Sequence, residues 1–394
     1  MSTYREKHPK ALLLGLFDTA IATAHCLRPL GIRIIGVDFD LRLSGFSSRS
    51  LKPFLIPHPP EEERKAVDFI IALIRQESGK VIAIPTSDYF VRLLSKYREE
   101  FGACAAFLIP DADSIEMIIQ RGRQFEAARS AGLAVPDYLN GPVTLERIID
   151  MQWPFPLAVK PSNIIEWKKH FDNKGFVVNG PEELRQALSG VNAHTEAYLV
   201  QKVIPGDTSN NFEVNALYLP DGRLIQHTIR KVRQYPDLFG TATCIQNYPH
   251  EQLEQMAARF ITENKLYGFT NLEFKFSGAD QAYYYIETNI RVWLQINFSK
   301  SMGYNFAHIY YAYLAGLPIA GRAPENKLKK GKWVDFVPDI LFWVKYRIKY
   351  GLSLPALVKS WLPLKVANLF SLSDPWPFLK ELKLVKRFQH LLKM

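Results

Sequence analysis

Two glutamates of one segment stand where a β-hairpin would set them face to face. The segment runs from Thr270 to Gln295, and a reversal around Asp280 pairs Glu273 with Glu287. Like charges directly opposite each other destabilise a sheet. Two carboxylates about 5 Å apart repel by roughly 3 kcal/mol at an effective dielectric of about 20. A positive group is therefore expected beside these acids.

The same hairpin offers two ways to compensate the acids. Because strand side chains alternate with a period of two, one face is predicted to carry Glu273, Lys275, Tyr285, Glu287, Asn289 and Arg291. In one interpretation Lys275 and Arg291 form a surface ion-pair lattice with the acids. In the other, both carboxylates and the amide oxygen of Asn289 hold Mg²⁺, or Mn²⁺ in its place. Magnesium prefers oxygen ligands and often completes its shell with substrate phosphates.

The first third of the chain alternates between apolar runs and helical patterns. Apolar runs at 10–17 and 33–40 flank one helical pattern, and a second at 61–77 leads into the run at 80–85. This alternation predicts a parallel sheet covered on both faces, with a crevice lined by loops at the strand carboxyl ends. Asp18, Thr86, Ser87 and Asp88 fall on such loops, although Asp88 could equally cap a helix. The first loop has one glycine where GxGxxG needs three, which disfavours dinucleotide binding.

After about residue 130 the pattern changes to short strands and turns. Helical patterns at 181–189 and 250–266 interrupt these strands, which is typical of an α+β domain. The predicted fold class is thus α/β plus α+β. One strand carries Arg230, Lys231 and Arg233, and alternation places Lys231 and Arg233 on the same face.

The sequence resembles the ATP-grasp enzymes, most of which join a carboxylate to an amine. Glu273, Glu287, Asn289 and Arg291 are similar to the family's E…E-x-N-x-R metal motif, and the strand at 155–162 is similar to the one whose lysine, here Lys160, contacts ATP phosphates. The resemblance implies a Rossmann-like pre-ATP-grasp domain at 1–118 and ATP-grasp lobes at 119–320. The smaller lobe is expected at about 135–205 and the larger at about 206–320.

The resemblance also implies roles for further residues. The backbone around Gln201, Lys202 and Ile204 would meet adenine, and Asp207 would take the ribose. The remaining residues assigned to the nucleotide are Arg121, Lys174 and Lys275, with Arg121 in place of a usual lysine and Lys174 on a loop, 162–175, that closes over the phosphates.

The implied reaction is amide-bond formation through an acyl phosphate, because a carboxylate is a poor electrophile until it is activated. Transfer of the γ-phosphoryl group needs cations and metals on the phosphate oxygens. Arg291 is expected to stabilise the oxyanion, and Arg233 to face the acyl phosphate or the substrate carboxylate. The resemblance implies a small-molecule carboxylate and an amine as partners, expected to be amino acids or peptide-like precursors. No nucleic-acid partner is expected, since no nucleic-acid-binding pattern accompanies the charge.

Charge is distributed unevenly along the 394 residues. The chain carries a net +10, and the segment 321–394 accounts for all of it, with 15 Lys and Arg against 5 Asp and Glu. Three interpretations stay open for this basic helical extension: packing on the core, peripheral contact with an anionic membrane, or a surface for an anionic substrate.

Three widely spaced cysteines, Cys26, Cys104 and Cys244, suggest neither a zinc site nor a disulfide framework, and a reduced cytoplasm fits them best. The apolar run near the start is too short for a signal peptide and is predicted to be a strand. Alternative functions are a peripheral membrane or scaffold protein with a non-catalytic ATP-grasp fold, or an ATP-grasp phosphotransferase. No oligomeric state is predicted.

Overall fold

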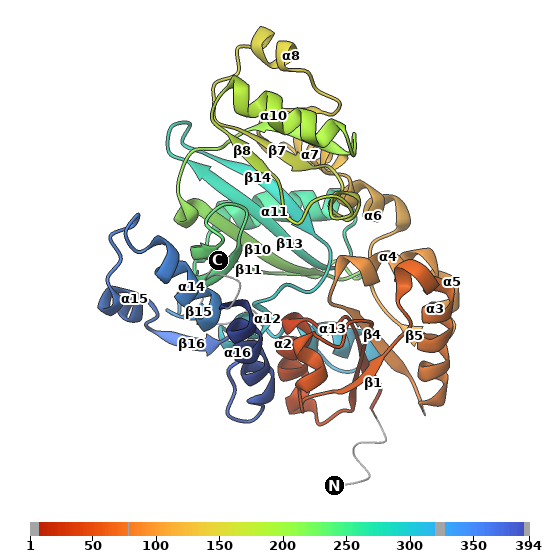
Figure 1. The fold of residues 1–394 in the computed structure, drawn as a ribbon. Coiled ribbons are helices and arrows are strands. Elements are labelled where there is room, and N and C mark those ends of the chain that lie inside the picture. The colour runs from red at the N-terminus through yellow and green to blue at the C-terminus, as the bar shows by residue number, and fades with distance from the viewer. Residues whose placement is uncertain (1–7, 78, 320–327, 390–394) are drawn as a thin grey trace.

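A computed structural model describes residues 8–77, 79–319 and 328–389, and its strands form three sheets (Figure 1). The first sheet is parallel and has the strand order β3-β2-β1-β4-β5. Its strands are β1 (Lys10–Leu14), β2 (Ile34–Asp38), β3 (Lys52–Leu55), β4 (Val81–Pro85) and β5 (Ala105–Ala106). Its helices are α2 (Asp18–Leu27), α3 (Pro59–Gln76), α4 (Asp88–Lys96) and α5 (Arg98–Gly102).

The alternation of apolar runs and helical patterns is confirmed in this sheet. Strands β1, β2 and β4 are almost wholly buried, which explains why they read as continuous apolar runs rather than as alternating ones. Two helices, α6 (Ala112–Ile119) and α7 (Arg121–Ser130), then lead away from the sheet.

A four-stranded antiparallel sheet forms a small lobe at the top of Figure 1, with the order β6-β9-β7-β8. Its strands are β6 (Tyr138–Asn140), β7 (Leu157–Pro161), β8 (Phe176–Val178) and β9 (Tyr198–Lys202), and its helices are α8 (Leu145–Asp150), α9 (Ile164–Trp167) and α10 (Pro181–Asn192). The lobe has its own hydrophobic cluster, which includes Leu184, Val159 and Trp167.

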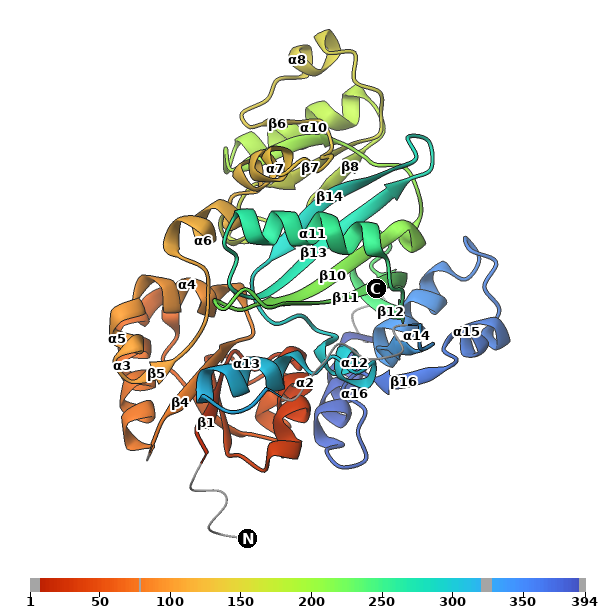
Figure 2. The same cartoon turned by 180° about the vertical axis from the view of Figure 1, so that it is seen from behind.

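The third sheet has seven strands in the order β14-β13-β10-β11-β12-β15-β16. Its first five strands are β10 (Asn211–Tyr218), β11 (Leu224–Tyr235), β12 (Thr241–Asn247), β13 (Gly268–Ser277) and β14 (Ala282–Asn289). Helix α11 (Glu251–Glu263) covers one face of it (Figure 2). Helices α12 (Ile296–Ser301) and α13 (Phe306–Ala315) follow β14 and pack against α2 of the first sheet.

The basic segment is not wholly helical, which corrects the expectation for 321–394. It contributes β15 (Lys332–Val334) and β16 (Leu364–Ala367) to the edge of the seven-stranded sheet, where β15 pairs with β12. Trp333 and Val334 are fully buried there, so pairing and apolar burial hold this segment to the sheet. The helices of the segment are α14 (Phe336–Tyr346), α15 (Leu354–Ser360) and α16 (Trp376–Gln389).

Candidate active site

Three glutamates form a row across three adjacent strands of the large sheet. Glu213 on β10 lies directly opposite Glu273 on β13, and Glu273 lies directly opposite Glu287 on β14. The predicted pairing of Glu273 with Glu287 is therefore confirmed, and a third carboxylate joins them. Neighbouring strands are about 4.8 Å apart, so this row needs positive charge close by.

A parallel row of amides crosses the same strands two residues further along. Asn215, Asn271 and Asn289 lie directly opposite one another on β10, β13 and β14. The Asn271 amide donates to the Asn215 side-chain oxygen at 2.8 Å and to Glu213 at 3.1 Å. The Asn289 amide donates to the Asn271 oxygen at 3.2 Å. Because residues two apart on a strand share a face, the asparagines extend the polar surface that the glutamates begin.

Lys231 and Arg121 compensate the glutamates. The Lys231 ammonium lies 2.7 Å from Glu273 and 3.3 Å from Glu213, and it is buried. An Arg121 nitrogen lies 2.6 Å from Glu287. The sequence proposed Lys275 and Arg291 as the members of an ion-pair lattice, but both have other neighbours in the structure.

The acids respond differently to this environment. Burial and the neighbouring Glu287 and Glu213 raise the pKa of Glu273, although Lys231 opposes that effect. Burial also disfavours the charge of Glu287, but Arg121 and Lys231 overcome it and lower its pKa to about 2. Glu287 is thus held ionised by its own cation, while Glu273 carries excess negative potential that a further cation would relieve.

A β-bulge corrects one detail of the predicted hairpin. The register shifts between Glu273 and Phe274, so that Phe274 pairs with Tyr285 and Ile286 is the extra residue. Tyr285 consequently joins the core with Phe274, and its hydroxyl donates to Thr288 at 2.7 Å. The prediction that Tyr285 shares the face of Glu287 is wrong, because uninterrupted alternation cannot account for the extra residue.

The acidic end of β14 opens into a pocket between the small lobe, α4 and the large sheet. Arg121, Glu287 and Asn289 line it together with Ser162 of the small lobe and Asp88 of the first sheet's unit. Arg121 begins α7, and its backbone N–H donates to the Ser162 carbonyl at 3.0 Å. Residues from all three sheets' units therefore meet at one pocket.

Two lysines of the small lobe lie near this pocket. Lys160 lies on β7 beside Pro161, which lines the pocket. Burial together with Arg121 lowers the pKa of Lys160 to about 8, although the glutamates oppose the shift. Its ammonium lies 4.9 Å from the ring centre of Phe239, which is on the loop between β11 and β12. Lys174 lies on the turn before β8. Burial lowers its pKa, although Glu287 and Glu273 oppose that shift. The structure therefore brings both predicted phosphate contacts into the field of the acids.

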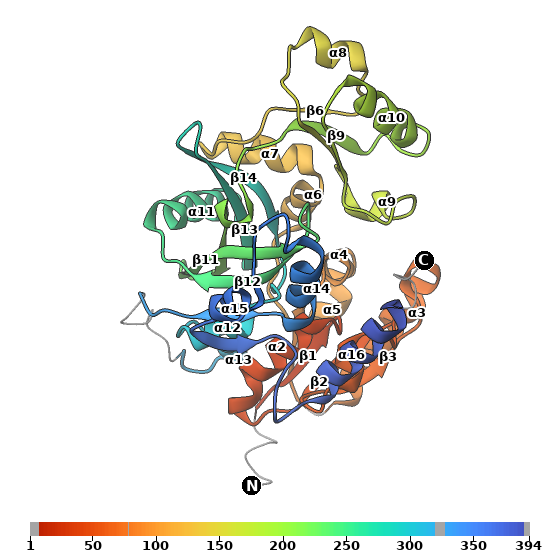
Figure 3. The same cartoon turned by 60° about the vertical axis from the view of Figure 1, so that its left-hand side comes forward.

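The loop that carries Lys174 has an internal anchor. The segment 162–175 contains the helical turn α9 (Figure 3). Trp167 on that turn is fully buried in the small-lobe cluster. Its indole N–H donates to the Asn173 carbonyl at 3.0 Å. The hydrogen bond between Trp167 and Asn173 therefore holds the residues between them against the small lobe.

The predicted adenine segment contains an unusual polar group. Gln201 on β9 is buried, and its side-chain oxygen has no hydrogen-bond partner among the described residues. A buried acceptor without a donor costs about 1 to 3 kcal/mol, so the amino group of a bound base would satisfy it. Ile204 is also buried, whereas the Lys202 ammonium turns to Asp137 at 2.7 Å.

The remaining two residues predicted to bind the nucleotide, Asp207 and Lys275, lie beside each other. Asp207 is exposed, caps the short 3-10 helix Thr208–Asn210, and accepts from the Ser209 N–H at 2.7 Å. Burial lowers the pKa of Lys275, and Asp207 opposes that shift. Lys275 thus lies near Asp207 at the linker between the lobes.

Arg291 follows β14 and reaches the first sheet's unit. Its Nε lies 3.2 Å from Asp88, which begins α4. Burial opposes the charge of Arg291, but Asp88 together with Glu287 and Glu273 raises its pKa. The crevice expected at the strand carboxyl ends thus contributes Asp88 to the candidate site.

Arg233 does not join the glutamates. Its guanidinium forms a two-point ion pair with Asp339 of α14, at 2.9 and 2.7 Å, and both side chains are buried. Asp339 also accepts from Thr243 and from the Trp361 indole. Register shifts on either side of Arg233 interrupt the alternation that placed it with Lys231. The expectation that it faces an acyl phosphate is therefore replaced by this buried pair.

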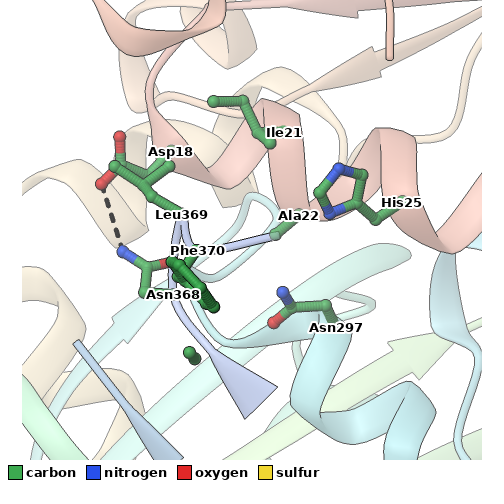
Figure 4. A pocket seen from close by; sticks show the side chains of 9 residues that line it. Asp18, Ile21, Ala22, His25, Asn297, Asn368, Leu369 and Phe370 are labelled. Carbon is green, nitrogen blue, oxygen red and sulfur yellow. Dashed lines mark hydrogen bonds between the residues drawn. The ribbon is translucent and has the colours of Figure 1, made fainter. Parts of the chain in front are cut away.

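A second, smaller pocket lies between α2, α12 and the residues after β16 (Figure 4). Asp18 accepts from the Asn368 amide at 3.3 Å, and the same amide donates to Asp335 at 2.9 Å. Burial and the charge of Asp18 raise the pKa of Asp335 to about 7. Burial, Asp335 and Asp18 raise the pKa of Glu381 to about 8. Asp18, predicted to line a crevice, thus faces this pocket.

The first pocket, together with Glu273 and Gln201 outside its lining, suits magnesium and a nucleotide. Glu273, Glu287 and Asn289 offer the hard oxygen donors that magnesium prefers, and the unpartnered oxygen of Gln201 suits a base amino group. In the described part of the chain, no group of three or more His, Cys, Asp or Glu is arranged to hold a metal by itself. A magnesium ion held by the two acids and the amide could complete its shell with phosphate oxygens.

Sequence patterns missed several residues of the site. Glu213, Asn215 and Asn271 alternate along their strands, but only the pairing of β10 with β13 shows that they continue the two rows. Alternation places Lys231 on the same predicted face as Arg233, but the sequence does not show that it contacts the glutamates. The sequence signal for these residues is the alternation of polar with apolar residues along each strand. This signal does not show which strands are neighbours in the sheet.

Comparison with known proteins finds one curated relative and similar solved structures. No protein-family model matches the chain. A curated relative, the D-aspartate ligase of Enterococcus faecium (strain Aus0004), is 25% identical over 249 residues, and the match covers 59% of this chain. The chain spans 58% of that relative's length.

Two solved structures show the same architecture. The N5-carboxyaminoimidazole synthetase of Staphylococcus aureus, complexed with ADP, superposes with a TM-score of 0.62 and 10% identity, covering 79% of each chain. The L-amino acid ligase of Bacillus licheniformis superposes with a TM-score of 0.58 and 14% identity, covering 78% of this chain and 75% of that one. The fold is that of the ATP-grasp proteins, as the sequence predicts.

Proposed function

We propose that this protein is an ATP-dependent ligase that joins a carboxylate to an amine and releases ADP and phosphate. The observation that carries the proposal is the opposition of Glu273 and Glu287 beside a pocket that also receives Arg121 and adjoins Lys160. Acids for a metal and cations for phosphates are what phosphoryl transfer requires. The relatives named as ligases support the same reaction class.

In this proposal each side chain acts on a defined part of the reactants. Gln201 accepts from the base, and Lys160, Lys174 and Arg121 neutralise phosphate oxygens. Glu273, Glu287 and Asn289 would hold magnesium, which supplies charge neutralisation on the phosphates.

The chemistry has two steps. A substrate carboxylate oxygen takes the γ-phosphoryl group, and ADP leaves. The amine then attacks the acyl carbon, the C–O bond to phosphate breaks, and the amine loses a proton. Arg291 stabilises the oxyanion of the tetrahedral intermediate, since its pKa is raised and its charge is retained. Excluding water protects the acyl phosphate from hydrolysis.

We infer that the substrates are amino acids or peptide-like compounds. The support comes from the names of the relatives, a D-aspartate ligase and an L-amino acid ligase, and from guanidinium groups near the pocket, which suit carboxylate recognition.

A phosphate-release screen tests the proposal. Pairs of amino acids are supplied with ATP and Mg²⁺, and product amide is detected by mass spectrometry. The proposal predicts phosphate release that needs acid, amine and Mg²⁺ together. Turnover without an amine would indicate a phosphotransferase. Binding of ATP without turnover on any pair would favour a non-catalytic ATP-grasp protein.

A further inference from the structure

The outer side of the α14–α15 unit exposes apolar side chains at helical spacing. On α14 and the turn after it, Ile340, Val344 and Ile348 are four residues apart, and 44%, 51% and 88% of their side chains are exposed. On α15 and just beyond it, Leu354, Val358 and Leu362 repeat the same spacing, all exposed. A helix face with this many apolar side chains is normally covered by the protein core, by a partner or by a membrane.

The other sides of these helices already have partners. Phe342 and Asp339 of α14 are buried, as is Leu357 of α15. The rings of Phe336 and Trp361 are in edge contact at 5.0 Å, and the Trp343 indole donates to the Leu352 carbonyl at 2.8 Å. These contacts join α14 and the α15 segment into one unit, which protrudes from the side of the molecule (Figures 1 and 2). The exposed apolar residues thus form the outer face of this unit.

The exposed charge of the segment that carries this outer face has one sign. The segment 328–368 contains eight Lys and Arg against two Asp, Asp335 and Asp339, and both aspartates are buried. The bases exposed there are Lys329, Lys330, Lys345, Arg347, Lys349, Lys359 and Lys365. The one acid from another segment that contacts them in the described structure is Asp237, which is paired with Lys349 at 2.6 Å.

We propose that this outer face docks on an anionic lipid bilayer. Apolar side chains between lysines match the layering of a membrane interface, in which acyl chains lie beneath anionic headgroups. A protein partner would need acidic groups distributed to match seven scattered cations, whereas a bilayer supplies negative charge everywhere. In the described part of the chain no helix has the length and apolarity to cross a membrane. The proposed contact is peripheral.

Vesicle co-sedimentation with the full chain tests this proposal. The vesicles contain equal parts of phosphatidylglycerol and phosphatidylcholine, with pure phosphatidylcholine as the comparison. We expect binding to the anionic vesicles that weakens steeply with added salt. Val344→Ser, Ile348→Ser and Leu362→Ser combined should lower the partition constant at least about 100-fold. Lys345, Arg347, Lys359 and Lys365 changed together to Gln should do the same.

Matched controls separate this surface from general stickiness. Ile149→Ser with Met151→Ser removes two exposed apolar side chains from the small lobe and should leave vesicle binding unchanged. Because every altered side chain is exposed, all variants should keep the wild-type melting temperature. Absence of binding to anionic vesicles, or binding that the triple Ser variant retains, would overturn the proposal. So would sedimentation velocity showing self-association that the same variant abolishes, since the face would then join two copies of the chain.

Discussion

The ammonium of Lys231 on β11 reaches past β10 to lie 2.7 Å from the carboxylate of Glu273 on β13. It also contacts Glu213 on the strand between them, at 3.3 Å. One buried cation thus serves two members of the glutamate row. Desolvation opposes its charge, but Glu273 and Glu213 overcome that and raise the pKa of Lys231. Lys231 thus compensates part of the negative charge of the row.

Replacing Lys231 with Met should destabilise the metal-free protein by roughly 3 to 5 kcal/mol, the usual cost of removing one partner of a buried ion pair. Millimolar Mg²⁺ with a non-hydrolysable ATP analogue should recover part of this loss, because a cation again neutralises the row. Urea unfolding with and without the ligands measures both effects. Lys231→Arg, which keeps the charge, is the control. An unfolding midpoint that does not move in the Met variant would show that the ion pair contributes nothing.

Gln201→Leu should weaken ATP binding by about tenfold without loss of stability. The side-chain oxygen of Gln201 is buried and unpartnered in the described structure, so an apolar replacement removes an unsatisfied acceptor rather than a bond. Isothermal titration with an ATP analogue measures the affinity, and thermal unfolding measures the stability. Equal affinities of the two proteins for the analogue would remove Gln201 from the adenine site.

Arg233→Met should destabilise the protein by roughly 3 to 5 kcal/mol, since it leaves the buried Asp339 carboxylate without its cation. Adding Asp339→Asn should restore most of that stability and leave ligase turnover near the wild-type rate. The double variant separates a structural role from a chemical one. If it folds with wild-type stability but turns over at least about 100-fold more slowly, Arg233 does act on the reactants.

Stability should fall as pH rises through neutrality, because of the acids at the second pocket. Burial and neighbouring charge raise the pKa of Asp335 to about 7 and that of Glu381 to about 8. The folded chain therefore holds protons that the unfolded chain releases near pH 4. The stabilisation is complete below that pH and is lost as pH rises through about 7 to 8, by up to about 1.4 kcal/mol per pH unit for each group.

Asp335→Asn should flatten this dependence and raise the melting temperature at about pH 8.5, with little change near pH 5. Asp113→Asn, which alters an exposed acid, is the matched control. Melting temperatures across this range measure the effect. A variant whose curve runs parallel to the wild-type curve would show that Asp335 does not titrate near neutral pH.

The sequence predicts those parts of the site that depend on local pattern. The facing of Glu273 and Glu287 follows from one turn and from alternation, and the strands around Lys160 and Gln201 follow from short apolar runs. The ATP-grasp fold follows from the resemblance these residues carry together.

Features that depend on strand order or on irregular backbone escape prediction. Glu213 joins the row only because β10, rather than another strand, lies beside β13. The bulge at Ile286 turns Tyr285 to the core, and the register shifts near Arg233 give it a partner 106 residues away. A one-residue shift reverses the face of every side chain that follows, so such irregularities decide which polar residues meet.

The most direct test of the account is Mn²⁺ binding, followed by electron paramagnetic resonance in the presence of a non-hydrolysable ATP analogue. The account predicts that Mn²⁺ binds the wild-type protein only together with the nucleotide. It also predicts that Glu273→Gln and Glu287→Gln each lower the affinity at least about tenfold while the fold is kept. Wild-type Mn²⁺ affinity in both variants would contradict the assignment of these glutamates as ligands, and the ligase proposal with it.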